Sequence, residues 1–334
     1  MKRGVLSIFI AGSAAVAFGG CSETGSQLPA GSSPSSFNDV VPLHNSWSLG
    51  KAIPTPVLCA ASAAVGAKIY VLGGVESSQT IVGLNQIYDT KTNSWSKGKA
   101  MPTPRWCAGA AVVNGIIYTV GGNTTISGIS NVVEAYDPKK NSWSEKAALP
   151  IGDAPAAAAA GSFVYAIGGF SFGSGRLANV YRYDPKTNKW TTRASLRLGR
   201  SNPGVGTYGK HIVVADGLTN SGVTGETEVY STTTDHWGAV ATDSTARTAV
   251  CAAVVDGKLY SAGGQLGGGS APTTDVLHAY DIKNNLWSSK AKMPQASVAP
   301  ASAFVGGRFY CISGASSGNP NGATFYNKVQ IYQP

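Results

Sequence analysis

Short apolar runs, interrupted by Gly, Asn and Asp, recur along most of the chain. Within residues 107–143 the run "CAGAAVV" is followed by Asn114-Gly115, a second run "IIYTVGG" ends in two glycines, and a third, "VVEAYD", leads to an acidic turn and Trp143. Asn-Gly between apolar runs favours a tight hairpin because both residues tolerate positive φ. The pattern predicts four short antiparallel strands, the last of which begins at the Trp.

The same pattern returns at a nearly constant interval. Successive Trp residues are 48, 48, 47, 47 and 50 positions apart, and each internal copy has a Tyr seven positions before the Trp and an Asn or Asp two positions before it. A Gly-Gly pair marks the same units, with Asp216-Gly217 and Ser313-Gly314 as two degenerate copies. The Trp residues in this register are Trp47, Trp95, Trp143, Trp190, Trp237 and Trp287.

A four-stranded sheet of this size cannot bury both faces alone, so we expect the units to stack on one another in a ring. Trp and Tyr would fill the wedge between neighbouring sheets, and Gly-Gly would let the backbones approach closely. The last unit stops at residues 332–334, "YQP", before its fourth strand, whereas residues 43–47, "LHNSW", are a fourth strand without the first three. The N-terminal strand is therefore expected to complete the last sheet.

Composition agrees with an all-β fold. The 334 residues include 42 Gly, 17 Pro, 14 Tyr and 7 Trp, and 13% are charged, which suits short strands and turns better than long solvated helices. The Gly-Gly, the Tyr and the following Trp resemble the Kelch repeat, over about residues 40–334. The resemblance implies an all-β, six-bladed Kelch β-propeller at residues 39–334, with four antiparallel strands per blade.

The N-terminal residues have the layout of an export signal. Lys2 and Arg3 precede an apolar stretch and then Gly19-Gly20-Cys21, so residues 1–20 are predicted to be a signal peptide. The ending resembles a bacterial lipobox, which would make Cys21 an acylated N-terminus and a membrane anchor; simple secretion is the alternative. Residues 21–38 are small and polar and predict a flexible tether. The protein is thus expected in the cell envelope, lipid-anchored or otherwise secreted, without a nucleic-acid partner.

The four remaining cysteines leave their pairing open. Cys59, Cys107, Cys251 and Cys311 lack a CxxC or any short paired spacing, so no zinc site is predicted and a disulfide framework has only weak support. Buried free thiols are the favoured interpretation.

The resemblance also indicates where a ligand would bind. In an up-and-down blade the loop after Gly-Gly and the crossover to the next blade lie on one face, and loops on a rigid scaffold are the usual place for binding residues. Arg stands sixteen positions before the first position of the Gly-Gly pair, or of its degenerate copy, in three units. These are Arg105, Arg200 and Arg247, with Val57, Gly152 and Ser297 in the other units.

Arg in this register resembles the Kelch adaptors of ubiquitin ligases, where it can line the mouth of the propeller and bind acidic peptides. The similarity implies an anionic ligand, since Arg pairs bidentately with carboxylates; the alternative is that these Arg brace neighbouring loops. Trp106 would offer a stacking surface or pack under a loop. Phe170, Phe172 and Tyr326, in the loops after Gly-Gly, complete the predicted ligand-binding set.

No catalytic, metal or cofactor motif is evident. The four His form no His-x-His pattern, and the sequence has no P-loop and no G-x-S-x-G. Asp153, one residue past the Arg register, is the preferred acid or base if one exists. The favoured interpretation is a binding module for an anionic or polar ligand, a protein segment or a glycan. A sugar-modifying enzyme similar to the exported Kelch propeller that interconverts sialic acid forms, and a structural envelope protein, are the alternatives.

Overall fold

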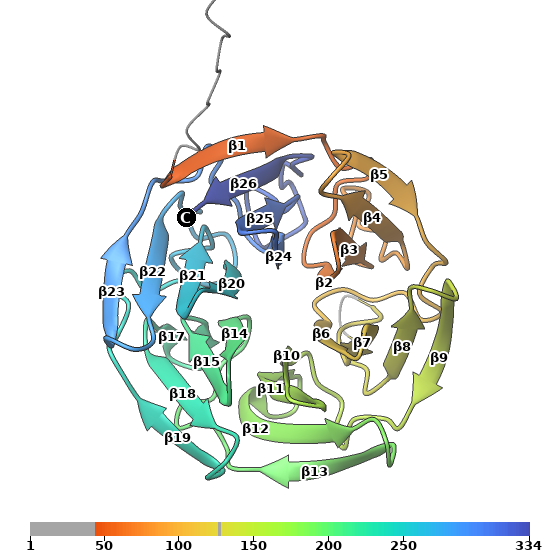
Figure 1. Ribbon diagram of the computed structural model, residues 1–334, viewed down its shortest axis with the longest axis vertical. Helices are drawn as coiled ribbons and strands as arrows, with labels where there is room; N and C mark the ends of the chain where they lie inside the picture. The colour runs from red at the N-terminus through yellow and green to blue at the C-terminus, as the bar shows by residue number, and fades with distance from the viewer. Residues whose placement is uncertain (1–43, 126–127) are drawn as a thin grey trace, which may run out of the picture. The chain divides into compact units, whose positions relative to one another are not determined.

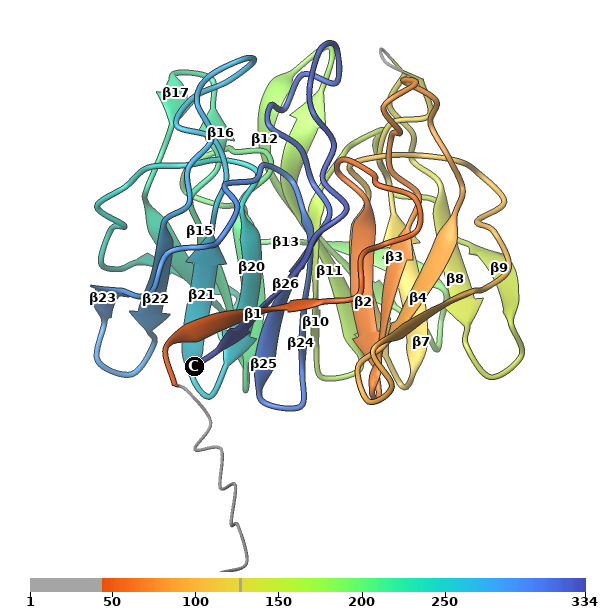
Figure 2. The same cartoon turned by 90° about the horizontal axis from the view of Figure 1, so that it is seen from above.

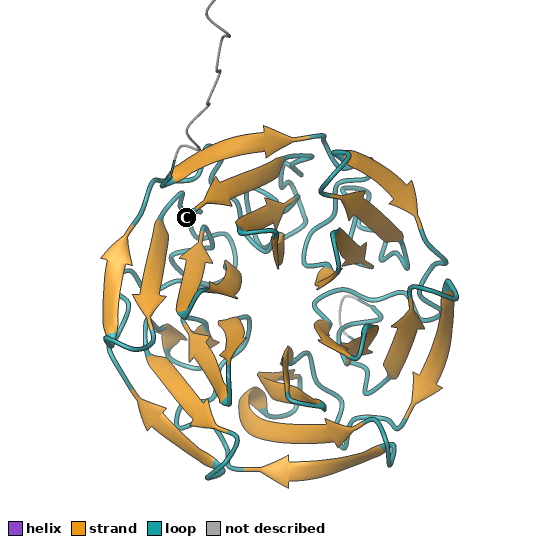
Figure 3. Cartoon of the chain, in the orientation of Figure 1, coloured by secondary structure: helices purple, strands orange, loops and turns teal. Residues whose placement is uncertain are grey.

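The computed structural model describes residues 44–125 and 128–334, which form strands and loops without helices (Figure 3). Among these residues nothing forms a helix long and apolar enough to cross a membrane. They make six four-stranded antiparallel sheets, which we call blades, and one short hairpin of β16 (Leu218–Thr219) and β17 (Gly222–Val223).

Each blade runs from an inner strand a to an outer strand d. Blade 1 contains β2 (Ala61–Val65), β3 (Lys68–Leu72), β4 (Asn85–Asp89) and β5 (Ser94–Lys97), and blade 2 contains β6 (Gly109–Val113), β7 (Ile116–Val120), β8 (Val133–Asp137) and β9 (Ser142–Lys146). Blade 3 contains β10 (Ala156–Ala160), β11 (Phe163–Ser171), β12 (Gly175–Asp184) and β13 (Lys189–Arg193), and blade 4 contains β14 (Gly204–Tyr208), β15 (His211–Ala215), β18 (Thr227–Ser231) and β19 (His236–Ala239). Blade 5 contains β20 (Cys251–Val255), β21 (Lys258–Ala262), β22 (Leu277–Asp281) and β23 (Leu286–Ser289), and blade 6 contains β24 (Ala301–Val305), β25 (Arg308–Ile312), β26 (Val329–Gln333) and β1 (Ser46–Gly50).

The blades form a closed ring around a central channel, with the six a strands innermost (Figure 1). Strand β1 pairs antiparallel with β26, from Ser46 opposite Gln333 to Gly50 opposite Val329. The predicted six-bladed propeller and its closure by the N-terminal strand are therefore confirmed. The loops between strands b and c are long and rise together with the d-to-a crossovers on one face, which we call the crossover face (Figure 2).

The repeated Tyr, Asn or Asp, and Trp clamp each blade to the one before it. In blade 1 the Tyr88 hydroxyl donates to Asn93 Oδ1 at 2.6 Å, the Trp95 indole N–H donates to the Lys51 carbonyl at 2.8 Å, and the Lys51 N–H donates to Asn93 Oδ1 at 2.7 Å. Lys51 directly follows the d strand of blade 6. All six blades repeat these bonds. The acidic or amide residue has positive φ in each case, which explains why Asn and Asp occupy it.

The Gly-Gly pairs join neighbouring blades through the backbone. The N–H of the second glycine donates to a carbonyl in the next blade's crossover, as Gly122 does to Asp153 at 2.9 Å. Gly121, the first glycine of the same pair, has φ of +59°, and a Cβ there would collide with the Asp153 carbonyl oxygen and lie 2.9 Å from Pro155 Cδ, both in blade 3. A side chain would therefore push the two blades apart.

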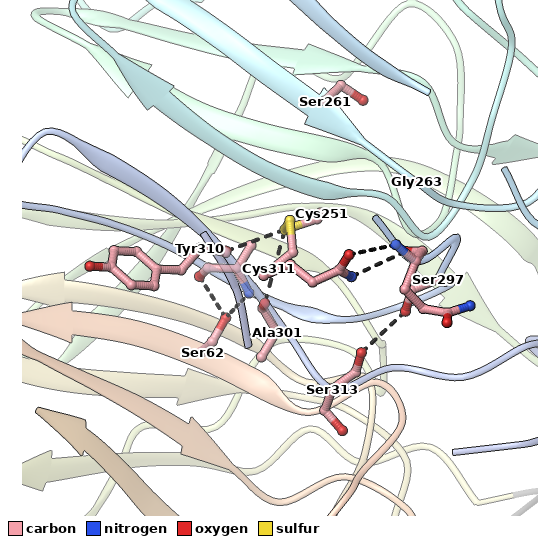
Figure 4. The surroundings of a disulfide bond; sticks show 12 residues. Ser62, Cys251, Ser261, Gly263, Ser297, Ala301, Tyr310, Cys311 and Ser313 are labelled. Carbon is pink, nitrogen blue, oxygen red and sulfur yellow. Dashed lines mark hydrogen bonds between the residues drawn. A yellow bond between two sulfur atoms is a disulfide. The ribbon is translucent and has the colours of Figure 1, made fainter. Parts of the chain in front are cut away.

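Two disulfides also join neighbouring blades, and the favoured interpretation of free thiols is wrong. Cys59 bonds Cys107 between blades 1 and 2, with Cα atoms 4.8 Å apart, and Cys251 on β20 bonds Cys311 on β25, with Cα atoms 5.9 Å apart (Figure 4). The spacings of 48 and 60 residues gave no sign of pairing because the ring, not the local sequence, brings these positions together.

Candidate functional site

The three Arg residues predicted to bind a ligand lie in the blade interior. Arg105, Arg200 and Arg247 all have exposed fractions of 0%. Each one directly precedes a residue that lines the mouth of the channel. Successive side chains of an extended segment point to opposite sides. The Arg side chains therefore point away from the channel and into the interior of the blade. They offer no surface to a ligand, and the prediction of an Arg-lined mouth is corrected by their burial.

Each buried Arg is paired with acidic side chains or carbonyl oxygens of its own blade. Arg105 Nη2 lies 2.9 Å from Glu134 Oε2, and Arg200 Nη2 lies 2.6 Å from Glu228 Oε1. Burial lowers the pKa of Arg200, and the Glu228 carboxylate opposes this shift. Arg247 pairs with Asp243 at 2.8 Å and donates to the carbonyls of residues 261, 263 and 276. These bonds hold the crossover against strands b and c. The Arg residues therefore brace the loops around them, which is the alternative to ligand binding given for them above.

Asp153, and not Gly152, occupies the Arg register in blade 3. The second glycine of blade 2, Gly122, donates to the Asp153 carbonyl, just as Gly169 donates to the Arg200 carbonyl and Gly217 to that of Arg247. Counting sixteen residues back from Gly168 fails because the blade 3 crossover is one residue shorter. A carboxylic acid therefore stands where three other blades carry a buried Arg.

The Asp153 carboxyl is buried without a cation. Its exposed fraction is 1%, and no Lys or Arg of the described residues pairs with it. Burial raises its pKa to about 7, although the backbone N–H groups of Ala154 and Phe170 donate to it. Its Oδ1 atom has no hydrogen-bond partner among the described residues.

The free energy of unfolding should therefore fall as the pH rises from about 4 to about 7, because the folded state retains the Asp153 proton that the unfolded chain has lost. The slope is about 1.4 kcal/mol per pH unit for one such group. The Asp153→Asn variant should gain stability relative to the parent by up to a few kcal/mol over this window, and the difference isolates Asp153 from Asp216, whose pKa burial also raises to about 7. Denaturant unfolding at several pH values measures it, with the exposed Asp256→Asn as control. Parallel stability curves for Asp153→Asn and the parent would contradict the assignment.

A cavity of about 260 Å³ opens at the channel mouth on the crossover face, and we call it the mouth pocket. Its wall combines aromatic, amide, hydroxyl and guanidinium groups from blades 2 to 6. The principal side chains are Trp106, Asn123, Phe170, Arg176, Thr248 and Gln265. Below it, the channel encloses about 350 Å³ and is lined chiefly by Ala, Pro and Gly.

Several polar atoms of this wall have no hydrogen-bond partner among the described residues. They are Trp106 Nε1, Asn123 Oδ1, Arg176 Nε and Thr248 Oγ1, all with almost no solvent-exposed area. Buried polar groups are normally paired, so each unpaired group needs an explanation, such as a bound water or ligand. Arg176 also has no carboxylate partner among the described residues and lies over the Phe170 ring, 5.2 Å from its centroid. Sequence reasoning missed Arg176 because its position depends on the extended β11–β12 hairpin.

Comparison with known proteins assigns the family. The model of the KLHDC2/KLHL20/DRC7 Kelch-repeats domain matches residues 5–214, and the Kelch motif matches residues 246–294. The chain belongs to the Kelch-repeat family. This Kelch propeller is similar to the solved structure titled "Structure of YjhT", with a TM-score of 0.71 and 19% identity over 83% of this chain and 95% of that one. At this identity the likeness shows a shared fold. No curated protein matches the sequence.

The other predicted site residues of this Kelch propeller divide between the mouth pocket and its surroundings. Trp106 and Phe170 line the pocket, whereas Phe172 and Tyr326 do not. Phe172 is 57% exposed and contacts Phe170 edge-on, at 5.2 Å between ring centroids. Cys21, with the predicted signal peptide and tether, lies outside the described residues. Among the described residues no group of three or more His, Cys, Asp or Glu is placed to hold a metal ion.

Proposed function

We propose that this Kelch propeller is a binding module whose mouth pocket takes a saccharide. The observation that carries the proposal is the cluster of unpaired polar groups of Trp106, Asn123, Arg176 and Thr248 beside two aromatic rings. Small-molecule sites are concave, mostly apolar and equipped with a few convergent polar groups. A sugar ring presents both hydroxyl groups and apolar C–H faces, which match this wall.

Each wall residue has a distinct role in the proposed complex. The Trp106 indole offers an apolar surface and its N–H a donor. Arg176, free of any carboxylate among the described residues, supplies the donors for an anionic or strongly polar substituent. Asn123 Oδ1 and Thr248 Oγ1 accept from ligand hydroxyl groups. A polar protein segment is the alternative occupant.

The enzyme alternative rests on Asp153. A carboxyl with a pKa of about 7 suits proton transfer near neutral pH. However, Asp153 is 1% exposed and is not part of the pocket wall, and the described wall residues include no Asp, Glu, His, Lys or Tyr. Binding is therefore the function that we propose.

We place the protein in the cell envelope, with Cys21 acylated as a membrane anchor. Two disulfides support an oxidising compartment. The basic start, the apolar stretch and Gly-Gly-Cys at residues 19–21 support export and acylation. Mass spectrometry of the mature N-terminus tests this placement, and an unmodified N-terminal residue other than Cys21 would contradict the anchor.

Trp106→Ala should weaken saccharide binding by about tenfold or more, because it removes both the stacking surface and the indole donor. Calorimetry with neutral, N-acetylated and uronic acid oligosaccharides first identifies a ligand of the mature chain. Tyr208→Ala is the control, since Tyr208 is an aromatic residue that is 49% exposed on β14 and lies outside the pocket wall, so its loss should leave the affinity unchanged. Equal affinities of the parent and Trp106→Ala for the saccharide would show that the ligand binds outside the mouth pocket.

A further inference from the structure

A ring of backbone hydrogen bonds surrounds the channel at the base of the mouth pocket. Cys107 N–H donates to the Cys59 carbonyl at 2.6 Å, Cys59 to Ala299 at 3.1 Å, Ala299 to Ala249 at 2.7 Å and Ala249 to Asn202 at 2.9 Å. Each bond joins one blade to its neighbour. The five residues have φ between +48° and +54°, a conformation that costs energy for non-glycine residues and that the ring bonds hold in place.

The ring is interrupted at blade 3. In five blades three residues separate the register residue from strand a, as Ser201, Asn202 and Pro203 do between Arg200 and β14. Blade 3 has two, Ala154 and Pro155, between Asp153 and β10. The left-handed residue has no counterpart there. Among the described residues, the Cys107 carbonyl and the Asn202 N–H consequently have no partner on the side of blade 3.

Four side chains with unpaired polar atoms belong to blade 3, where the ring is interrupted, and to the preceding blade. Trp106 and Asn123 belong to blade 2, and Asp153 and Arg176 belong to blade 3; all four have an unpaired polar atom. Cys107 and Asn202 themselves line both the mouth pocket and the channel below it. The other ring residues, Cys59, Ala249 and Ala299, line both cavities as well, so the mouth pocket and the channel meet at the ring. Three of the four unpaired wall atoms, those of Trp106, Asn123 and Arg176, belong to blades 2 and 3, on the side of the gap.

We propose that the gap recognises an acylamino group, so that the saccharide ligand is an N-acetylated amino sugar. The inference rests on the proposed saccharide-binding function and specifies the ligand class. The amide N–H of the ligand donates to the Cys107 carbonyl, and its amide oxygen accepts from the Asn202 N–H. One amide thereby supplies the donor and the acceptor that the missing residue of blade 3 would have supplied.

The channel below the gap fits the rest of the acetyl group. Its upper wall is made of small apolar side chains, among them Ala60, Ala108, Ala156 and Ala157. A methyl group next to the bound amide would enter this space, whereas an ammonium or a hydroxyl group in the same place would lose hydrogen bonds to water. The geometry therefore favours an acetamido group over the free amine and over the hydroxyl of an ordinary hexose.

Three trisaccharides that differ at one substituent test the ligand class on the mature chain. Chitotriose carries acetamido groups, the deacetylated glucosamine trimer carries ammonium groups, and cellotriose carries hydroxyl groups. Calorimetry should show chitotriose binding at least about tenfold more tightly than the other two, the equivalent of one or two hydrogen bonds. Equal affinities would overturn this inference and leave the proposed function standing. If none of the three and no other oligosaccharide binds, or only an acetylated peptide does, the proposed function fails together with the inference.

A variant that closes the ring tests the gap itself. Inserting one Asn between Ala154 and Pro155 copies the Asn202-Pro203 pair of blade 4, and it should abolish the preference for chitotriose while leaving the melting temperature equal or higher. The matched control inserts Asn between the exposed Asn321 and Gly322, outside the pocket wall. In the parent, chitotriose should also slow hydrogen exchange of the Asn202 amide. A ligand that binds without affecting this amide would refute the role of the gap, whether or not the insertion variant folds.

Discussion

Replacing Arg200 by Ala should lower the free energy of unfolding by about 3–5 kcal/mol, the typical result of removing one partner of a buried ion pair. Glu228 would remain buried without its cation, since its exposed fraction is 1%. The carbonyls of Asp216 and Glu226, which accept from Arg200 Nη1 at 3.0 and 2.6 Å, would also lose a donor. Urea unfolding of the variant and the parent measures the difference.

Arg197 provides the control, because it lies in the same crossover but is exposed. Arg197→Ala should change stability by no more than about 0.5 kcal/mol. The double change Arg200→Met with Glu228→Leu should recover part of the loss, because it leaves no unpaired buried charge. If Arg200→Ala melted like the parent and instead lost affinity for the saccharide, the ligand-binding role predicted from the Kelch resemblance would be restored.

The sequence contained a sign of the bracing role that the register alone did not reveal. Blades 2 and 4, which carry Arg105 and Arg200, have Glu134 and Glu228 two positions before the Tyr of the repeat. Blades 1 and 6 have Gln86 and Gln330 at that position and no Arg. Both Gln side chains bond the backbone of the crossover that leads into their own blade, as the two Glu side chains also do, but they have no Arg to pair with. An Arg accompanied by an acid in its own repeat is typical of an internal pair.

The fold followed from the sequence because the signals that build it are local and repeated. Trp, Tyr and Asn or Asp recur in every blade because every blade makes the same clamp, so six copies support one another. Closure was predictable for the same reason, since residues 332–334 contain the Tyr and residues 43–47 the Asn and Trp of one Tyr-to-Trp segment.

The candidate site depends instead on the departures from the repeat. Arg176 reaches the mouth because β11 and β12 are longer than the other b and c strands. Asp153 enters the Arg register because the blade 3 crossover lacks one residue. The repeat describes what the blades have in common and leaves such differences out. Only the structure shows that both departures lie in blade 3, at the mouth of the channel. Trp106 and Phe170 were predictable because each lies beside a regular landmark of the repeat.

Removing residues 1–50 should destabilise the whole ring by about 5 kcal/mol or more, because loss of a buried Trp alone typically costs about 3–5 kcal/mol. Strand β26 would lose all its pairs with β1 and become an open edge. Trp47, which lies 5.2 Å from Tyr332 between ring centroids and donates to the Ala291 carbonyl, would be missing from the wedge between blades 5 and 6. Thermal unfolding of the chain beginning at Lys51, compared with a chain beginning at His44, measures the effect.

A synthetic peptide of residues 44–52 makes this test specific to the missing strand. Added to the truncated chain, it should raise the melting temperature with the logarithm of its concentration above the dissociation constant, because only the folded ring offers β26 as a partner. The same peptide with Trp47 replaced by Ala should restore far less, since it keeps the backbone pairs but leaves the aromatic site empty and the Ala291 carbonyl without its donor. A truncated chain that melts within a few degrees of the control, or that ignores the peptide, would show that the other five blades hold the ring without the closing strand.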